Sequence, residues 1–396
     1  MSQKLIIGLQ HFIAMFGATI LVPILTGFPI SVALFASGVG TLIFHYMTYN
    51  KVPAYLGSSF AFIAPLSLVI AEYGGVATAS GGIIFAGLVY VLVAYLIRLG
   101  GIKNLEKILP PVVTAPIIMI IGLSLAPVAI DNLTASGGVG VVVGIITLVS
   151  AIVTAIFGSN FIKTLPVLIG VAVGYIFAGI FGLVNLEGVV NAGLVGMPGF
   201  VVPQFNLSAI MIIAPVAIVT IVEHVGDILA IGETIDNPDI ISDPGLDNTL
   251  LGDGLATIFA GALGGLPNTT YGENTGVLAL TGVHDSAVVR VGAIIAIIAS
   301  FIPKIEQLLM GIPDPVIGGI SILLFGMITA IGIRTLVESK TDMGNMRNLI
   351  IVSIILILGL GGAVVNIGPV EISSMAVASI VGILLNMILP ASIERS

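Results

Sequence analysis

The sequence predicts an all-α protein that crosses a membrane many times. Hydrophobic residues make up 57% of the 396 residues, charged residues only 8%, and the 50 glycines raise the non-polar share to about 70%. A soluble domain is about 25% charged and buries only about three quarters of its surface at this length, so it could not hide this much apolar surface. About fourteen apolar spans of ~20 residues would account for the composition.

Apolar stretches separated by Gly, Pro, Asn and Asp define the individual segments. They are predicted at 5–26, 30–48, 56–72, 79–98, 110–130, 138–158, 162–184, 207–232, 250–265, 268–282, 286–303, 315–336, 347–363 and 371–390. The third and tenth, 56–72 and 268–282, are too short or too polar for ordinary spanning helices, and each opens with a Gly/Ser/Thr-rich lead. We therefore expect these two segments to be broken, with a short extended stretch before a half-helix.

The Lys and Arg residues predict the orientation of these segments. With the N-terminus inside, only Lys304 of the 12 basic residues would lie outside. The cytoplasmic side would hold Lys4, Lys51, Arg98, Lys103, Lys107, Lys163, Arg290, Arg334, Lys340, Arg347 and Arg395. Because short cytoplasmic loops carry an excess of Lys and Arg, we expect both termini to be cytoplasmic.

The segments divide into seven and seven around the polar stretch 185–206. An odd-numbered unit repeated in tandem inserts its second copy upside down. Inverted repeats of this kind build a substrate site near mid-membrane from broken helices. The half-helices would direct the partial positive charge of their N-termini at whatever lies between them.

Three acidic residues lie within apolar segments, where charges are expensive: Glu223 and Asp227 in the eighth, and Glu273 in the tenth. Such groups usually mark a substrate or ion pathway, although a buried acid satisfied by a neighbouring helix is the alternative. Glu223 and Asp227 are four residues apart and share one helix face. Carboxyl groups that share a cavity titrate as a unit, and they donate or accept hydrogen bonds according to their protonation. They suit a small planar molecule with alternating N–H and C=O groups, and they suit proton coupling.

Three further polar residues each leave two interpretations open. His11 is a proton relay or a hydrogen-bonded packing residue. His224 is adjacent to Glu223, about 100° around the helix, and need not face the same way. Asp253 opens the segment 250–265, either as a helix cap or as a brace for the site.

Several function classes are disfavoured by what the sequence lacks. There is no basic cluster for nucleic acid and no Cys for a disulfide, a thiolate zinc site or a nucleophile. No His-Glu-x-x-His or phosphate-binding glycine loop is present, which argues against an enzyme. The acidic loop 233–249 does not fit the spacing of an EF-hand, so a solvated linker is favoured and no metal site is predicted.

Five motifs in the expected order resemble the nucleobase–ascorbate transporter family. Over about residues 5–390, they are Gln10-His11, Gly57-Ser58-Ser59-Phe60-Ala61-Phe62, Glu223-His224-Val225-Gly226, Asn268-Thr269-Thr270-Tyr271-Gly272-Glu273, and Glu273-Asn274-Thr275-Gly276 followed by Thr281-Gly282. The fourth is most similar to the bacterial uracil permease branch.

The resemblance implies a core domain from segments 1–4 and 8–11 and a gate domain from segments 5–7 and 12–14. Residues 1–130 would hold the first part of the core and the start of the gate, 131–206 the rest of the first gate part, 207–304 the second core part, and 305–396 the second gate part. It also implies a homodimer in the cytoplasmic membrane of a prokaryote. Proton symport of a nucleobase would proceed by relative movement of core and gate, with no cofactor beyond the coupling proton.

The resemblance also implies roles for individual residues. Glu223 would bind the nucleobase edge and Glu273 a second ring N–H. Backbone amides at Phe60 and Gly272 would contact a ring carbonyl, and Phe60 or Tyr271 would help to enclose the ring. Supporting roles would fall to Asn274, which braces the half-helix, and to His11, His224 and Ser59.

One position departs from the uracil branch, which has His four residues after the eighth-segment Glu, where this chain has Asp227. Asp there resembles purine-transporting members, but those usually carry Gln in place of Glu273. Because Glu273 faces substrate in the family, uracil is favoured over a xanthine-like purine, and Glu223 with its neighbour Asp227 is the expected proton carrier. An anion exchanger or channel of the same architecture is the remaining alternative.

Overall fold

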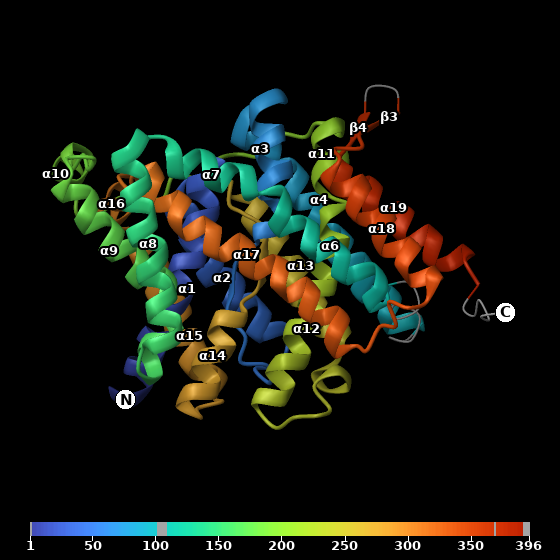
Figure 1. Cartoon of the computed structure of the whole chain (residues 1–396). Coiled ribbons are helices and arrows are strands. Elements are labelled where there is room, and N and C mark those ends of the chain that lie inside the picture. Colours follow the sequence, from blue (N-terminus) through green and yellow to red (C-terminus); the bar gives the residue numbers. More distant parts are fainter. Residues whose placement is uncertain (1, 101–108, 368–369, 391–396) are drawn as a thin grey trace.

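Helices dominate the computed structural model of the chain, which describes residues 2–100, 109–367 and 370–390 (Figure 1). Within these ranges, seven helical spans are long and apolar enough to cross a membrane, or eight if one bent pair counts as a span. The polytopic helical membrane fold is therefore confirmed, whereas fourteen crossings stay a prediction. Lys103, Lys107 and Arg395, which contribute to the predicted orientation, lie outside the described residues.

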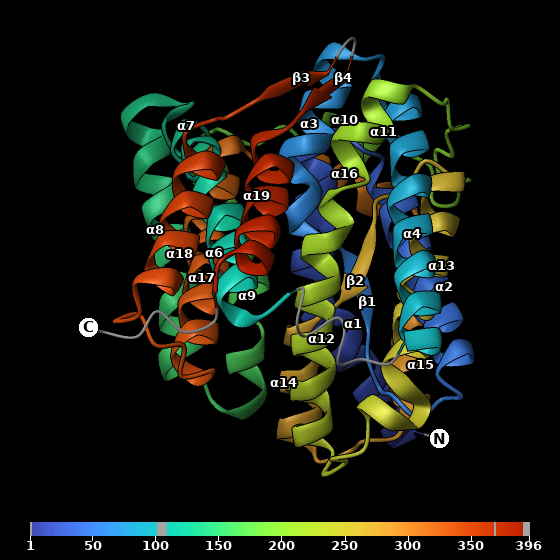
Figure 2. The same ribbon diagram turned by 90° about the vertical axis from the view of Figure 1, so that its right-hand side faces the viewer.

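Most of the helices pack side by side as two groups, as Figure 2 shows. The first helix group consists of α1 (Ser2–Thr26), α2 (Ile30–Met47), α3 (Ile63–Glu72), α4 (Gly75–Gly100), α11 (Leu207–Ile213), α12 (Val216–Thr234), α13 (Leu246–Ala262), α14 (Gly272–Thr281) and α15 (Ser286–Ser300). The second helix group consists of α6 (Pro111–Ser124), α7 (Ala126–Thr134), α8 (Gly137–Phe157), α9 (Pro166–Ile180), α17 (Asp314–Glu338), α18 (Met346–Leu360) and α19 (Ser374–Ile388). Each group therefore combines an early and a late part of the chain.

Short elements connect or interrupt these helices. They are β1 (Leu56–Ser58), η1 (Phe60–Phe62), η2 (Asn160–Thr164), α10 (Glu187–Asn191), the kinked turn η3 (Ile241–Gly245), β2 (Asn268–Thr270), α16 (Pro303–Met310), β3 (Val365–Ile367) and β4 (Val370–Ile372). The pairing of β3 with β4 was not predicted from the sequence, so the all-α description was incomplete. The 84° bend between α15 and α16, where Pro303 opens the new helix, was not predicted either.

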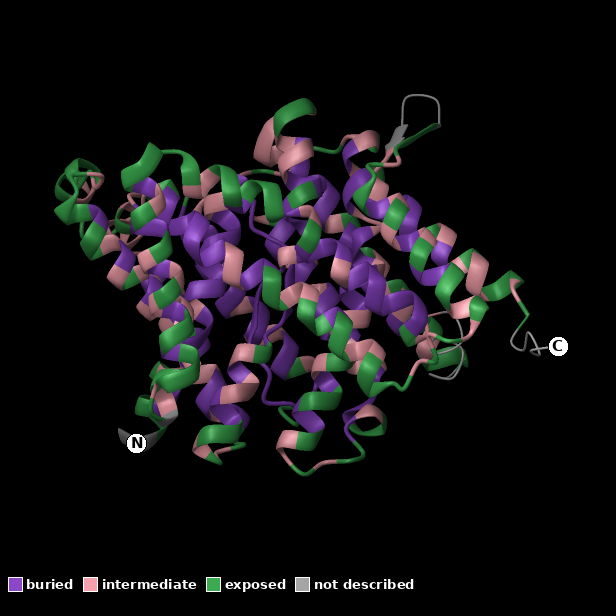
Figure 3. Ribbon diagram, in the orientation of Figure 1, coloured by how far each residue is buried: buried purple, intermediate pink, exposed green. Residues whose placement is uncertain are grey.

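Buried residues concentrate in the middle of the molecule, whereas exposed residues cover its outside (Figure 3). The outward faces of α8 and α9 are apolar despite their exposure, since Ile156, Ile176 and Ile180 are 58%, 62% and 70% exposed. Large apolar patches of this kind indicate contact with another apolar phase. In a membrane protein that phase is lipid.

Strands β1 and β2 form a buried antiparallel pair that joins the two halves of the chain. Leu56 pairs with Thr270, and Ser58 pairs with Asn268. The short extended stretches expected in 56–72 and 268–282 are therefore confirmed.

The free edges of this pair are covered by side chains from neighbouring helices. On α2, Ser37 Oγ donates to the Leu56 carbonyl (2.6 Å), and Thr41 Oγ1 accepts from the Leu56 amide (2.9 Å). On α13, Thr257 Oγ1 bonds both the amide and the carbonyl of Asn268, each at 3.2 Å. These bonds explain how non-helical backbone is tolerated here, because an unsatisfied group in an apolar medium costs several kcal/mol.

Acidic side chains at the end that carries the N-terminus pair with basic ones. Lys4 Nζ donates to Asp285 (2.6 Å), Arg98 Nε donates to Asp247 (2.8 Å), and Lys51 bonds Asp243. Two acids of the predicted loop 233–249 thus tie helix ends together.

Candidate functional site

A cavity of about 280 Å³ lies between the two helix groups. The first group, together with η1, β2 and Tyr271, lines it with Phe60, Glu223, Asp227, Thr269, Thr270, Tyr271, Gly272 and Glu273. The second group contributes α17, through Leu324, Met327, Ile328 and Ile331. One wall therefore carries every polar lining side chain, and the opposite wall is entirely apolar.

The three acids singled out in the sequence meet in this cavity. Glu223 and Asp227 come from one face of α12, as their spacing predicts, and Glu273 lies in the first turn of α14. All three are half-buried. An acid in the first turn of a helix is stabilised by the helix dipole, which helps α14 to carry Glu273 in apolar surroundings.

Asp227 is held to the polar wall by strand β2. Thr270 Oγ1 donates a hydrogen bond of 2.9 Å to Asp227 Oδ2. A Cβ atom built on Gly272 would have the Asp227 carboxylate, at 4.0 Å, as its nearest neighbour. Asp227 therefore lies beside the start of α14, in the same cluster as Glu223 and Glu273.

Two helix N-termini open at the same cavity, because η1 begins at Phe60 and α14 begins at Gly272. The first amides of a helix have no partner within that helix. Phe60 and Gly272 thus offer backbone donors next to acidic side chains. The polar wall can both donate hydrogen bonds and accept them.

Tyr271 links the two broken segments. Its side chain is only 4% exposed, and its hydroxyl donates to the Ser58 carbonyl (2.9 Å) and accepts from Thr19 Oγ1 (3.3 Å). A Cβ atom on Gly57 would lie 2.3 Å from the Tyr271 ring, so this close approach requires glycine. Ser59, which is also buried, donates its amide to the Pro267 carbonyl (3.0 Å).

Asn274 and His11 connect α14 to α1. Asn274 Nδ2 donates to the His11 carbonyl (3.0 Å) and lies 3.1 Å from His11 Nδ1. Neither residue lines the cavity. Both are fully or almost fully buried, so they brace the start of α14 from behind.

His224 lies away from the cavity, in a fully buried contact with α13. Its Nδ1 lies 2.8 Å from Asp253 Oδ2, and its Nε2 lies 2.9 Å from Thr249 Oγ1. Asp253 is not a helix cap, because α13 begins seven residues earlier, at Leu246. That interpretation was wrong, and the structure favours the alternative in which Asp253 braces α12 through His224.

The apolar wall was not predicted from the sequence. Leu324, Met327, Ile328 and Ile331 recur at helical spacing along one face of α17. The sequence pattern of an apolar helix face is the same whether that face contacts lipid, another helix or a ligand. No signal in the sequence could have separated these alternatives.

Solved structures share the fold at low sequence identity. The transmembrane domain of the cyanobacterial bicarbonate transporter BicA has a TM-score of 0.67 and 14% identity, covering 97% of this chain and 96% of that one. The murine Solute Carrier 26 family member A9 anion transporter, in the inward-facing state, has a TM-score of 0.68 and 11% identity, covering 97% and 67%. At these identities the likeness is one of fold alone.

Comparison with known protein families identifies a membrane transport protein rather than an enzyme. The "Permease family" model matches residues 2–368, and the chain belongs to this family, as the motifs of the nucleobase–ascorbate transporters predicted.

Curated relatives match almost the whole chain. The uracil permeases of Bacillus caldolyticus and Bacillus subtilis are each 45% identical over 98% of this chain, covering 92% and 93% of their own lengths. The uracil permease of Escherichia coli K12 is 41% identical, covering 98% of this chain and 91% of its own.

Proposed function

We propose that this protein imports uracil together with protons. The observation that carries the proposal is the shared cavity of Glu223 and Glu273, beside two helix N-termini and opposite an apolar wall. The names of the relatives, uracil permeases at 41–45% identity, support the same substrate.

The two walls of the cavity suit the two sides of a pyrimidine ring. Uracil has N–H and C=O groups around most of its ring and an apolar C5–C6 edge. Glu223 and Glu273 would accept from the ring N–H groups, and the amides at Phe60 and Gly272 would donate to a carbonyl. The C5–C6 edge would then face Met327 and the rest of the α17 wall, so that no buried polar group lacks a partner.

The proposed architecture assigns fourteen membrane crossings in two inverted sevens. The first helix group would be the core domain, formed by segments 1–4 within residues 1–130 and by residues 207–304. The second group would be the gate domain, formed by segment 5, which ends the range 1–130, and by residues 131–206 and 305–396. Support comes from the two packed groups, each built from both halves of the chain. Relative movement of core and gate would expose the cavity to each side in turn. We further propose a homodimer in a prokaryotic cytoplasmic membrane with both termini cytoplasmic.

Proton coupling is assigned to the acids of α12. Glu223 would carry the proton, because it lines the cavity where the ring binds and can be neutralised there before the cavity closes. Asp227, on the same helix face and bonded to Thr270, would act as its coupled neighbour.

The proposal is tested by uptake of labelled uracil into proteoliposomes, with and without an inward proton gradient. Competition by xanthine, hypoxanthine and ascorbate gives the selectivity. We expect the gradient to drive accumulation and excess unlabelled uracil to compete best. Uracil accumulation that does not depend on the proton gradient would contradict symport. Stronger competition by xanthine than by unlabelled uracil would favour the purine alternative suggested by Asp227. An anion substrate is disfavoured by the three acidic side chains that line the cavity, since carboxylates there would repel it.

Glu273→Gln is expected to shift preference from uracil toward xanthine by roughly tenfold, because an amide accepts less strongly from a ring N–H but can also donate to the bare ring nitrogen that xanthine has and uracil lacks. The ratio of uracil to xanthine uptake measures this effect. Glu233→Gln, at an exposed position on the same helix as Glu223, serves as the control. An unchanged ratio in Glu273→Gln would mean that selectivity lies elsewhere.

Asp227→Asn is expected to flatten the pH dependence of uptake while changing the KM for uracil by less than about threefold. Asparagine keeps an oxygen that can accept from Thr270, but it cannot take up a proton. Initial rates measured from acidic to alkaline external pH test this prediction. Loss of uracil binding with an intact pH dependence would exclude Asp227 from coupling.

A further inference from the structure

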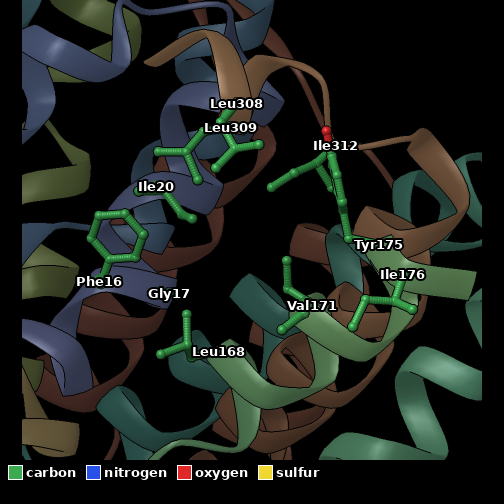
Figure 4. A pocket seen from close by; sticks show the side chains of 11 residues that line it. Phe16, Gly17, Ile20, Leu168, Val171, Tyr175, Ile176, Leu308, Leu309 and Ile312 are labelled. Carbon is green, nitrogen blue, oxygen red and sulfur yellow. The ribbon is translucent and has the colours of Figure 1, made fainter. Parts of the chain in front are cut away.

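A second cavity, of about 320 Å³, opens between α1, α9 and α16 (Figure 4). We call it the α9 groove, and it shares no lining residue with the substrate cavity. Its floor is buried and consists of Gly17, Ile20, Leu309 and Ile312. Its rim is exposed and includes Ala172, Ile176 and Leu308. The groove is therefore open at the surface rather than enclosed.

The chemistry of the α9 groove differs from that of the substrate cavity. Tyr175 is its one polar lining side chain, and the Tyr175 hydroxyl is buried without a hydrogen-bond partner among the described residues. A nucleobase would find only the Tyr175 hydroxyl as a side-chain partner for its several N–H and C=O groups, which are costly to bury unpaired. A hydrocarbon chain needs only apolar contact, which the rest of the lining supplies.

The groove opens onto a surface that faces lipid. Ile176 on its rim is 62% exposed, and Ile180 one turn further along α9 is 70% exposed. The groove is thus continuous with the apolar outer face of α9. In a bilayer, the molecules that meet this face are the acyl chains of phospholipids.

Lys304 lies on α16 beside the rim of the groove. It is four residues before Leu308 in the same helix, so the two residues share a helix face. Among the described residues no acidic group pairs with the Lys304 ammonium. A basic side chain at the end of an apolar groove complements a phosphate attached to an acyl chain.

We propose that the α9 groove binds one acyl chain of a phospholipid, whose phosphate pairs with Lys304. Because α1 belongs to the first helix group and α9 to the second, the bound chain contacts both groups. The site is independent of uracil and of the assignment of the substrate cavity.

Native mass spectrometry of the full chain, reconstituted with dioleoyl phosphatidylglycerol and released from mild detergent, tests the site. We expect the wild type to retain one lipid per chain. Ala172→Phe, which fills the groove from its exposed rim, should lower retention by more than about tenfold. Ile180→Phe, on the same helix but outside the groove, should retain lipid like the wild type.

A second pair of variants tests the phosphate contact without touching the groove. Lys304→Gln should lower retention about fivefold, whereas Lys340→Gln, at an exposed position beyond the end of α17, should not. Retention by Ala172→Phe equal to that of the wild type would overturn the site. So would an Ala172→Phe variant that dissociates into monomers with its lipid intact, because the groove would then hold a second copy of the chain.

Discussion

Glu223→Ala and Glu273→Ala are each expected to abolish uracil uptake. Both carboxyl groups line the cavity proposed to bind uracil, and among the described residues no other acidic side chain except Asp227 lines it. Losing a hydrogen bond to a charged group costs about 1.5–3 kcal/mol, or roughly 10- to 150-fold in affinity. Alanine at position 223 would also remove the proposed proton carrier, so the loss there should extend to the maximal rate.

Uptake and uracil binding should be measured side by side in the same preparations. Glu233→Ala, an exposed acid at the end of α12, is the matched control and should transport like the wild type. Retained uptake in both cavity variants would refute the assignment of the site. Loss of uptake in the control as well would point to a general defect of α12.

Gly57→Ala is expected to disrupt the site although Gly57 does not itself line the cavity. The new methyl group would lie 2.3 Å from the Tyr271 ring and 2.7 Å from Thr19 Oγ1. The ring has little freedom to move, because its hydroxyl is bonded to Ser58 and Thr19. Overpacking of this kind costs about 1–3 kcal/mol, and here the strain falls on the pairing of β1 with β2.

The expected result for Gly57→Ala is a lower melting temperature in detergent and a loss of uracil uptake of at least about tenfold. Gly138→Ala is the control, because a Cβ atom at that position of α8 meets no atom within 4 Å. A Gly57→Ala variant with wild-type stability and uptake would contradict this prediction, because it would show that Tyr271 can move away from β1 without a loss of stability or activity.

The acidic half of the site could be predicted from the sequence because charges within apolar segments are rare and costly. Glu223, Asp227 and Glu273 stand out for that reason alone, and helical spacing places the first two on one face. The breaks in the third and tenth segments were predictable in the same way, from Gly, Ser and Thr where a spanning helix would be apolar.

The rest depends on contacts between distant residues. Nothing local in Leu56 or Thr270 indicates that they pair, and nothing in His224 indicates that Asp253 lies beside it. The α17 wall is hidden for a different reason: Met327 and its neighbours are ordinary residues for a membrane helix. Whether such a helix face lines a site depends on the residues that lie opposite it, and the fold determines those residues.

The pairing of β1 with β2 also constrains how the protein is made. About 210 residues separate Ser58 from Asn268, and ribosomes add about 5–20 residues per second, so β1 waits about 10–40 s for its partner. Ser37 and Thr41 on α2 are synthesised earlier and can cover one edge of Leu56 during that interval. The other edge has no partner until β2 is inserted. The cavity between the helix groups is therefore completed only late in biogenesis, and a chain truncated before β2 would leave bare backbone inside the bilayer, where each unpaired group costs several kcal/mol.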